Sequence, residues 1–338
     1  MHVSNKNILI ILLSIVLLFV LLLFIYKSTN NSHIIFGVAG SSLNYSDLNV
    51  LKSTNIKWMR FDVNLNNKSV EYIKNLTNNG FNILGILDYQ TLGLELNGSG
   101  CFKNCNWTLN NWNLTIEKTL DEYPNIHVWE IWNEPQFSEF QSGFLANGDP
   151  YNYFLMLKSA YKIIKKNDPN DTVLCLGGDN IYEGTYTEND YLWAKDLWSY
   201  GASNYCDAIS LHAYSGFEYL LNQTPPNSAY NMAYIFNNEL NLYENLTKKP
   251  IWITETGIPS AINNSYPNFI NATPQRQLEF LNQTMQLFTS KNYIRAIFWF
   301  DLKGSVDKPY NLDFGLFYAN MTKKPAFYAF NNTINKYS

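Results

Sequence analysis

Short apolar runs recur along the chain, and segments with helical spacing separate them. The runs are rich in Ile, Val, Phe and Trp, and each is short enough for a buried strand. They begin near Ile34, Lys57, Phe81, Val128, Thr172, Ala208, Pro250 and Ala296. Between some of these runs, apolar periodicity and helix-ending residues predict helices over Ser69–Asn79, Tyr151–Asn167 and Gln275–Thr289.

This alternation predicts an α/β fold, namely a (β/α)8 TIM barrel over residues 34–338. A doubly wound open sheet is the structural alternative, and it usually carries a Gly-rich turn after its first strand. The turn here, Gly37–Ser41, lacks the dinucleotide-binding pattern. In a barrel, the chemistry lies at the carboxyl ends of the strands.

One apolar run is long enough to cross a bilayer as a helix. It covers Ile8–Tyr26, 19 residues broken only by Ser14. The predicted organisation is a short cytoplasmic tail at 1–7, a transmembrane signal anchor at 8–26, a linker at 27–33 and the barrel at 34–338. A cleaved signal peptide is the alternative, although a signal core is usually shorter and ends in small residues.

The composition excludes several classes of protein. Only 15% of residues are charged and 16% are aromatic, the reverse of a disordered chain. The net charge of -4 and the pI of about 5.6 argue against a nucleic-acid partner. A mean hydropathy of -0.22, with one long apolar run, argues against several membrane spans.

Fifteen Asn-x-Ser/Thr sequons follow the apolar run, more than twice the number that chance predicts. They predict an N-glycosylated region outside the cell, with the anchor holding it to the membrane. The cysteines fit that exterior: Cys101 and Cys105 are candidates for a disulfide within one loop. Cys175 and Cys206 are a less favoured pair, since buried free cysteines behave as small apolar residues.

Two glutamates follow predicted strands where a barrel keeps its chemistry. Glu134 follows the fourth strand and Glu255 the seventh, so their side chains should face each other across the mouth. Paired carboxylates of this kind cleave glycosidic bonds. One acid protonates the leaving oxygen, and the other carboxylate attacks the anomeric carbon or activates water. This chemistry needs no metal and no cofactor, and none is predicted.

The two carboxyl groups must differ in protonation state. Arg60, on the second strand, would keep a neighbouring Glu ionised, and Glu255 is the available partner. Glu134 has apolar neighbours in sequence, which favour its protonated form. Glu130 lies on the same side of the fourth strand as Glu134 and is expected to be a buried structural partner.

The ordered motifs resemble those of the retaining glycoside hydrolases of clan A, above all families 5 and 39. The similarity rests on Glu130–Pro135, Thr254–Gly257, Arg60, His212–Tyr214, Trp299 and the closing segment Phe314–Phe330. It implies that Glu134 is the acid/base residue and Glu255 the nucleophile. It further implies that Asn133 binds the sugar 2-hydroxyl.

The same resemblance implies roles for three more residues. His212 and Tyr214 would line the site, with the Tyr214 hydroxyl bonded to the nucleophile, and Trp299 would floor the sugar subsite. Weaker candidates for binding sugar hydroxyls or rings are Asp88, Tyr89, Asp179, Asn180 and Asp301.

The expected function is an extracellular retaining β-glycoside hydrolase, with endo-acting β-1,4-glucanase, mannanase or xylanase activity favoured. An exo-acting β-glycosidase or a β-1,3-glucanase is the alternative, because Thr256–Ser260 resembles a family of β-1,3-glucanases. A non-catalytic carbohydrate-binding surface protein is the alternative from another class. The expected partners are a carbohydrate substrate and, through residues 8–26, the membrane.

Overall fold

A computed structural model describes most of the chain after the apolar N-terminal run. The described residues are 33–40, 47–97, 100–103, 105–137, 142–181, 185–214, 232–260, 272–304 and 313–338. No helix within these ranges is long and apolar enough to span a bilayer. The predicted transmembrane segment 8–26 lies outside the described residues.

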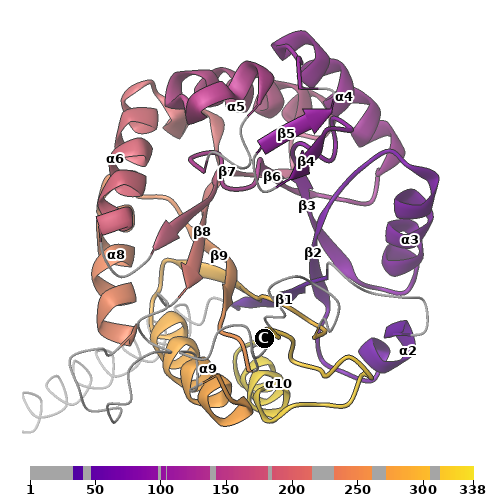
Figure 1. The fold of residues 1–338 in the computed structure, drawn as a ribbon, viewed down its shortest axis with the longest axis vertical. Coiled ribbons are helices and arrows are strands. Elements are labelled where there is room, and N and C mark those ends of the chain that lie inside the picture. The colour runs from indigo at the N-terminus through magenta and orange to yellow at the C-terminus, as the bar shows by residue number, and fades with distance from the viewer. Residues whose placement is uncertain are drawn as a thin grey trace, which may run out of the picture. The chain divides into compact units, whose positions relative to one another are not determined.

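Eight parallel strands close into a barrel, which confirms the predicted architecture and excludes the open sheet (Figure 1). Around the ring they follow the order β1-β10-β9-β8-β7-β6-β3-β2. Their bounds are β1 Ile35–Ala39, β2 Trp58–Asp62, β3 Asn82–Leu87, β6 Val128–Ile131, β7 Thr172–Ile181, β8 Ala208–Tyr214, β9 Ile251–Gly257 and β10 Ile294–Trp299. Each begins within two residues of its predicted start.

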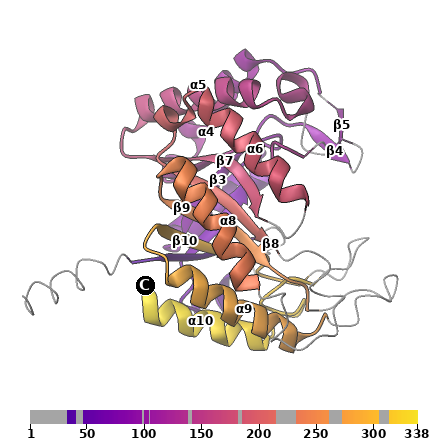
Figure 2. The same cartoon turned by 90° about the vertical axis from the view of Figure 1, so that its left-hand side faces the viewer.

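Helices surround the barrel, as the two views show (Figures 1 and 2). They are α2 Asp47–Lys52, α3 Asn67–Asn78, α4 Leu109–Glu122, α5 Pro150–Asn167, α6 Thr185–Ser199, α8 Met232–Thr247, α9 Pro274–Thr289 and α10 Pro325–Tyr337. Side-chain caps fix several starts, because the first turn of a helix lacks backbone partners for its N–H groups. Asn66 accepts from the Ser69 N–H, and Thr273 accepts from the Arg276 N–H just before the Pro274 start.

Smaller elements occupy the connections. The 3-10 helices η2 Gly143–Gly148 and η3 Ala202–Tyr205 precede α5 and β8. An antiparallel ribbon of β4 Glu95–Asn97 and β5 Gly100–Lys103 follows β3.

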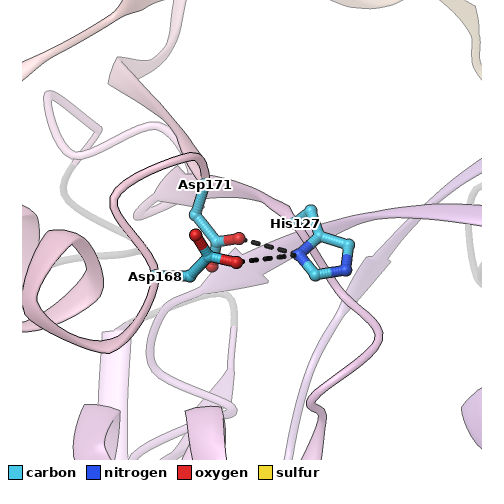
Figure 3. A group of neighbouring side chains, drawn as sticks. All are labelled: His127, Asp168 and Asp171. Atoms are coloured by element: carbon cyan, nitrogen blue, oxygen red, sulfur yellow. Dashed lines mark hydrogen bonds and ion pairs between the residues drawn. The ribbon is translucent and has the colours of Figure 1, made fainter.

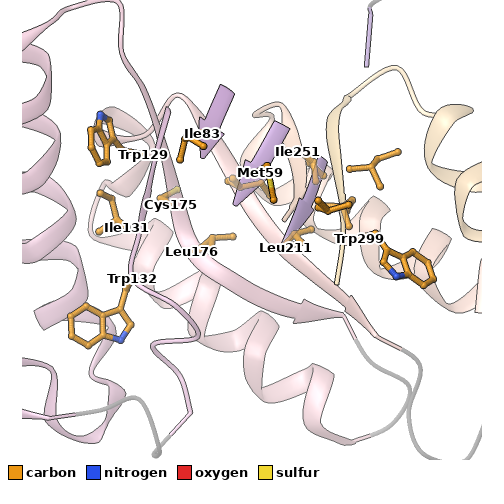
Figure 4. Close-up of a cluster of buried hydrophobic side chains, with 14 of the residues drawn as sticks. Met59, Ile83, Trp129, Ile131, Trp132, Cys175, Leu176, Leu211, Ile251 and Trp299 are labelled. Carbon is orange, nitrogen blue, oxygen red and sulfur yellow. The ribbon is translucent and has the colours of Figure 1, made fainter. Parts of the chain in front are cut away.

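The main apolar core lies between the strands and the surrounding helices, and Figure 4 shows part of it. A second, smaller cluster fills the barrel interior with Leu84, Val128, Leu174, Ala208, Trp252, Ala296 and Phe298. Further along three of these strands, the alternation of side chains brings polar residues to the same interior. Glu130, His212 and Thr254 are such residues, and all three are fully buried. The interior is therefore apolar near the amino ends of the strands and polar toward their carboxyl ends.

A disulfide joins Cys175 of β7 to Cys206, which lies just before β8. Their Cα atoms are 5.6 Å apart. This is the pairing that the sequence favoured less, because both residues lie in apolar surroundings. Cys105 is also disulfide-bonded. The side chain of Cys101, its predicted partner, lies outside the described side chains.

Candidate active site

Arg60 on β2 is the centre of a buried network at the carboxyl ends of the strands. Its Nε donates to Glu130 Oε2 at 2.6 Å, its Nη1 to Glu255 Oε1, and its Nη2 to Asn133 Oδ1 at 2.9 Å. Burial alone would lower the pKa of Arg60, but Glu130 and Glu255 outweigh burial and raise it. The guanidinium therefore stays charged and holds residues from β6, β9 and the loop after β6 in place.

Glu130 is fully enclosed by this network. It is 0% exposed, and its second oxygen, Oε1, accepts from the Thr254 hydroxyl at 3.0 Å. Both carboxylate oxygens thus have protein partners, and no face of Glu130 is open to a substrate. This geometry agrees with a structural role in orienting Arg60.

Glu255 on β9 has the surroundings that an ionised carboxylate needs. Arg60 and the Tyr214 hydroxyl each donate to one of its oxygens, and His212 Nε2 lies 3.7 Å from Oε1. Burial would raise the pKa of Glu255, but His212, Arg60 and Tyr214 together hold it below its ordinary value. A carboxylate that remains charged while largely buried is suited to nucleophilic attack.

Glu134 lies across a single imidazole ring from Glu255. Its Oε1 is 2.8 Å from His212 Nδ1, so the two ring nitrogens of His212 face different glutamates. Burial lowers the pKa of His212, but Glu255 and Glu134 more than compensate and the net change is upward. His212 therefore links the two carboxyl groups through its two ring nitrogens.

Two glycines of β7 allow this bridge to form. Gly177 and Gly178 have φ values of 62° and 78°, in the left-handed region that favours glycine. A Cβ on Gly178 would lie 2.1 Å from His212 Nε2, and one on Gly177 would lie 2.7 Å from Pro135 Cδ. The Gly177 carbonyl also accepts from the Glu134 N–H at 2.6 Å. Gly177 thus fixes the backbone of Glu134, and Gly178 leaves room for the imidazole of His212.

Trp299 does not form the floor that the sequence predicts. It is 0% exposed, its Nε1 donates to the Phe314 carbonyl at 3.0 Å, and its ring packs against Phe280 in the apolar core (Figure 4). A sugar cannot stack on a ring without an open face. The next residue, Phe300, is only partly buried, and its ring centroid lies 6.2 Å from that of Tyr214, which bonds Glu255. Strand alternation, which sends Phe298 into the barrel, is the signal that identifies Phe300.

The weaker candidates for sugar binding differ in how deeply they are buried. Asp88 is 0% exposed at the end of β3 and forms a side-chain hydrogen bond with Asp62 of β2. Tyr89 is half-buried, and burial together with nearby carboxylates raises its pKa. Asp301 is 8% exposed, and its Oδ1 accepts from the Leu302 N–H. The side chains of Asp179 and Asn180 lie outside the described side chains.

Asp190 of α6 is a site residue that the sequence did not indicate. It is 6% exposed, and its Oδ2 has no hydrogen-bond partner among the described residues. Burial, with a contribution from the charge of Glu134, raises the pKa of Asp190 to about 7. Nothing in its helical sequence context distinguishes it from a solvent-facing carboxylate.

A separate polar cluster lies at the opposite ends of β6 and β7 (Figure 3). His127 Nδ1 is 2.8 Å from Asp171 Oδ1 and 4.0 Å from Asp168 Oδ2. The second oxygen of Asp171 accepts from Trp129 Nε1 at 3.1 Å. Both oxygens of Asp171 thus have protein partners, so this group is a hydrogen-bonded link between two strand starts.

A family model described as the glycosyl hydrolase catalytic core matches residues 99–320, well over half of the chain. The chain belongs to this family. This membership agrees with the glycoside hydrolase chemistry that the strand-end glutamates predict. No curated protein is similar enough in sequence to match the chain.

Solved structures support the fold of this glycosyl hydrolase catalytic core. A family 39 glycoside hydrolase from Bacteroides cellulosilyticus matches 90% of this chain and 64% of its own, with 17% identity and a TM-score of 0.60. Xylanase 10B from Thermotoga maritima matches 90% of this chain and 96% of its own, with 17% identity and a TM-score of 0.59. A β-D-glucuronidase from Dictyoglomus thermophilum matches 90% and 51%, with 14% identity and a TM-score of 0.57. The chain thus spans 64% of the length of the family 39 enzyme and 51% of that of the β-D-glucuronidase.

Proposed function

We propose that this protein is a retaining β-glycoside hydrolase that works by double displacement. Glu255 attacks the anomeric carbon and forms a covalent glycosyl-enzyme, while Glu134 protonates the leaving oxygen. Glu134 then removes a proton from water, and the water displaces Glu255. The observation that carries the proposal is the hydrogen bonding of Glu255 to both Arg60 and Tyr214, which favours its ionised form.

Arg60 and His212 hold the two glutamates of this cycle in place. The Arg60 guanidinium stabilises the charged Glu255 carboxylate, and attack on the anomeric carbon converts that carboxylate into a neutral ester. His212 Nδ1, 2.8 Å from Glu134 Oε1, orients the residue that removes a proton from water in the second step. Asn133, bonded to Arg60, is placed to accept or donate to a sugar hydroxyl.

Azide rescue tests the two roles separately. Glu255→Gly should lose hydrolysis of aryl β-glycosides, and azide should restore turnover with an α-glycosyl azide as the product. Glu134→Gly should keep some activity on aryl substrates, and azide should yield a β-glycosyl azide. Glu117→Gln, an exposed residue of α4, is the matched control and should behave as wild type. An α product from Glu134→Gly would overturn the assignment.

For the substrate, we infer an internal β-1,4 linkage of a glucan, mannan or xylan, with exo-acting or β-1,3 activity as the alternative. The resemblance of the motifs to families 5 and 39 supports this choice. A polysaccharide panel with product sizing distinguishes the cases. Mixed oligosaccharides indicate internal cleavage, and a single small sugar indicates exo action.

We infer an extracellular location with an N-terminal membrane anchor. The disulfide between Cys175 and Cys206 is typical of an oxidising compartment. Several sequon asparagines are exposed, among them Asn106, Asn282 and Asn320. Digestion of protein from its native host with an N-glycosidase should reduce its apparent mass. Activity that stays inaccessible to polysaccharide added to intact cells would contradict the location.

A further inference from the structure

A pair of acidic side chains, Asp62 and Asp88, lies beside the catalytic network at the ends of β2 and β3. On β2, Asp62 follows Arg60 by two residues, so both point into the barrel and Asp62 lies one layer nearer the mouth. Asp62 interacts electrostatically with Arg60, Glu130 and Glu255. The pair therefore borders the space above the proposed nucleophile.

The two carboxyl groups lie close enough to interact, and two carboxyl groups at such range can share one proton. Asp88 is 0% exposed, and its Oδ1 accepts from the Gln90 N–H at 2.8 Å. Its Oδ2 receives no N–H or O–H donor among the described residues. Burial and the neighbouring Asp62 raise the pKa of Asp88 well above its usual range, which favours one proton and one negative charge on the pair.

Asp62 is the open member of the pair. Its side chain is only partly buried, and the neighbouring carboxyl group on the next strand is that of Asp88. An ionised carboxyl group has room for about four donors. Held in place by Asp88, Asp62 thus presents unused acceptor positions toward the mouth of the barrel.

Cations that could attract an acidic sugar are already engaged in the described part of the site. Arg60 donates to Glu130, Glu255 and Asn133, and His212 lies between two glutamates. The other charged side chains described there, Asp62, Glu134 and Glu255 among them, are carboxylic acids. This charge balance favours hydroxyl donors and disfavours a second carboxylate.

We propose that Asp62, positioned by Asp88, binds hydroxyl groups of a neutral sugar next to the cleaved bond and excludes uronic acids. This inference rests on the proposed function and adds the residue that selects a neutral sugar over an acidic one. It distinguishes the chain from structural neighbours named as β-glucuronidase and β-galacturonidase. One extra charge about 6 Å from the pair lowers affinity roughly 100-fold at an effective dielectric of 20.

Calorimetric titration with two inhibitors tests the inference. The probes are isofagomine and its C6 uronic counterpart, which differ by one carboxylate. Wild type should bind isofagomine about 100-fold more tightly than the uronic compound. Asp62→Asn should weaken isofagomine by about 10-fold or more, because hydrogen bonds to charged acceptors are the stronger ones.

Two further variants separate charge from structure. Asp88→Asn keeps a donor to Asp62 and one negative charge, so the discrimination should stay near that of wild type. Asp62→Asn/Asp88→Asn carries no charge, so discrimination should fall to within about 10-fold. Asp196→Asn, an exposed residue of α6, controls for an Asp-to-Asn change elsewhere. Thermal melts confirm that each variant is folded.

Equal binding of both probes by wild type, or unchanged discrimination in the double variant, would overturn the inference. Failure of the proposed function gives a different pattern. A protein that discriminates as expected but hydrolyses no glycoside would refute the hydrolase mechanism and leave the inference standing. Hydrolysis of neutral glycosides and uronides at equal rates would support the hydrolase mechanism and refute the inference about Asp62.

Discussion

Replacing the Asp190 carboxyl group with an amide should change the free energy of unfolding by an amount that depends strongly on pH. In the folded protein the pKa of Asp190 is about 7, against 3.8 for the ordinary carboxyl group. Between these two values the folded state holds a proton that the unfolded state has lost. The stabilisation from this proton is therefore complete below pH 3.8 and disappears as the pH rises through 7.

The magnitude follows from the size of the shift. Each pKa unit corresponds to about 1.4 kcal/mol, so the shift from 3.8 to about 7 corresponds to roughly 3.2 × 1.4 ≈ 4 kcal/mol. Asparagine has nearly the shape of the protonated acid but cannot ionise. Asp190→Asn should therefore match wild type near pH 4 and exceed it by up to about 4 kcal/mol near pH 8.

Urea unfolding followed by tryptophan fluorescence measures this difference at four pH values from about 4 to 8. The variant-minus-wild-type free energy of unfolding should rise steadily with pH. Asp196→Asn, exposed on the same helix, should show no such trend. A difference for Asp190→Asn that is constant across the range would refute the reasoning, because a purely steric effect of the amide does not depend on pH.

Three other changes test the packing around the site. Gly178→Ala places a Cβ 2.1 Å from His212 at a φ of +78°, so it should cost about 1–3 kcal/mol and most of the activity; a wild-type urea midpoint would contradict this clash. Cys175→Ser opens a loop of 31 residues and should cost about 3–4 kcal/mol, measured by urea unfolding. Reductant should then lower the midpoint of the variant less than that of wild type, because only the disulfide of Cys105 remains to be broken. Phe300→Ala should raise KM for aryl glycosides about 3–10-fold if its ring stacks on sugar, and an unchanged KM would exclude that contact.

The barrel could be predicted from the sequence because each strand is a compact apolar run with clear boundaries. Strands that are buried on both faces leave this signal directly in the residue types. Helix starts such as Pro274 were also visible, because proline suits the first turn. The ribbon of Glu95–Asn97 with Gly100–Lys103 was not predicted, since these short strands interrupt a connection without an apolar pattern.

The site was predictable where side-chain alternation along a strand decides the outcome. Glu130 was expected to be a buried structural partner, and it is 0% exposed and bonded to Arg60. The same rule assigns Phe300 rather than Trp299 to the mouth once Phe298 is known to point inward. A resemblance to a family does not reveal this one-residue difference, because it matches residue types and not directions.

Other parts of the site depend on contacts between distant segments. Asp190 lies on a helix, and its position near Glu134 follows only from how α6 packs on the barrel. Likewise, the shared proton of Asp62 and Asp88 requires two neighbouring strands to end at the right heights. Residue order along the chain does not carry this information.

The Arg60 network has a consequence for how the barrel assembles. Its partners come from both halves of the chain, because Glu130 lies on β6 and Glu255 on β9. A half-barrel ending after β6 would leave the guanidinium without the Glu255 carboxylate, and the complementary half would hold that carboxylate without its cation. Each separate half would thus lack one partner of the Arg60–Glu255 ion pair, and the formation of this pair would favour their association. The Arg60 network therefore forms only when β2, β6 and β9 have come together, so closure of the barrel and assembly of the active site are coupled.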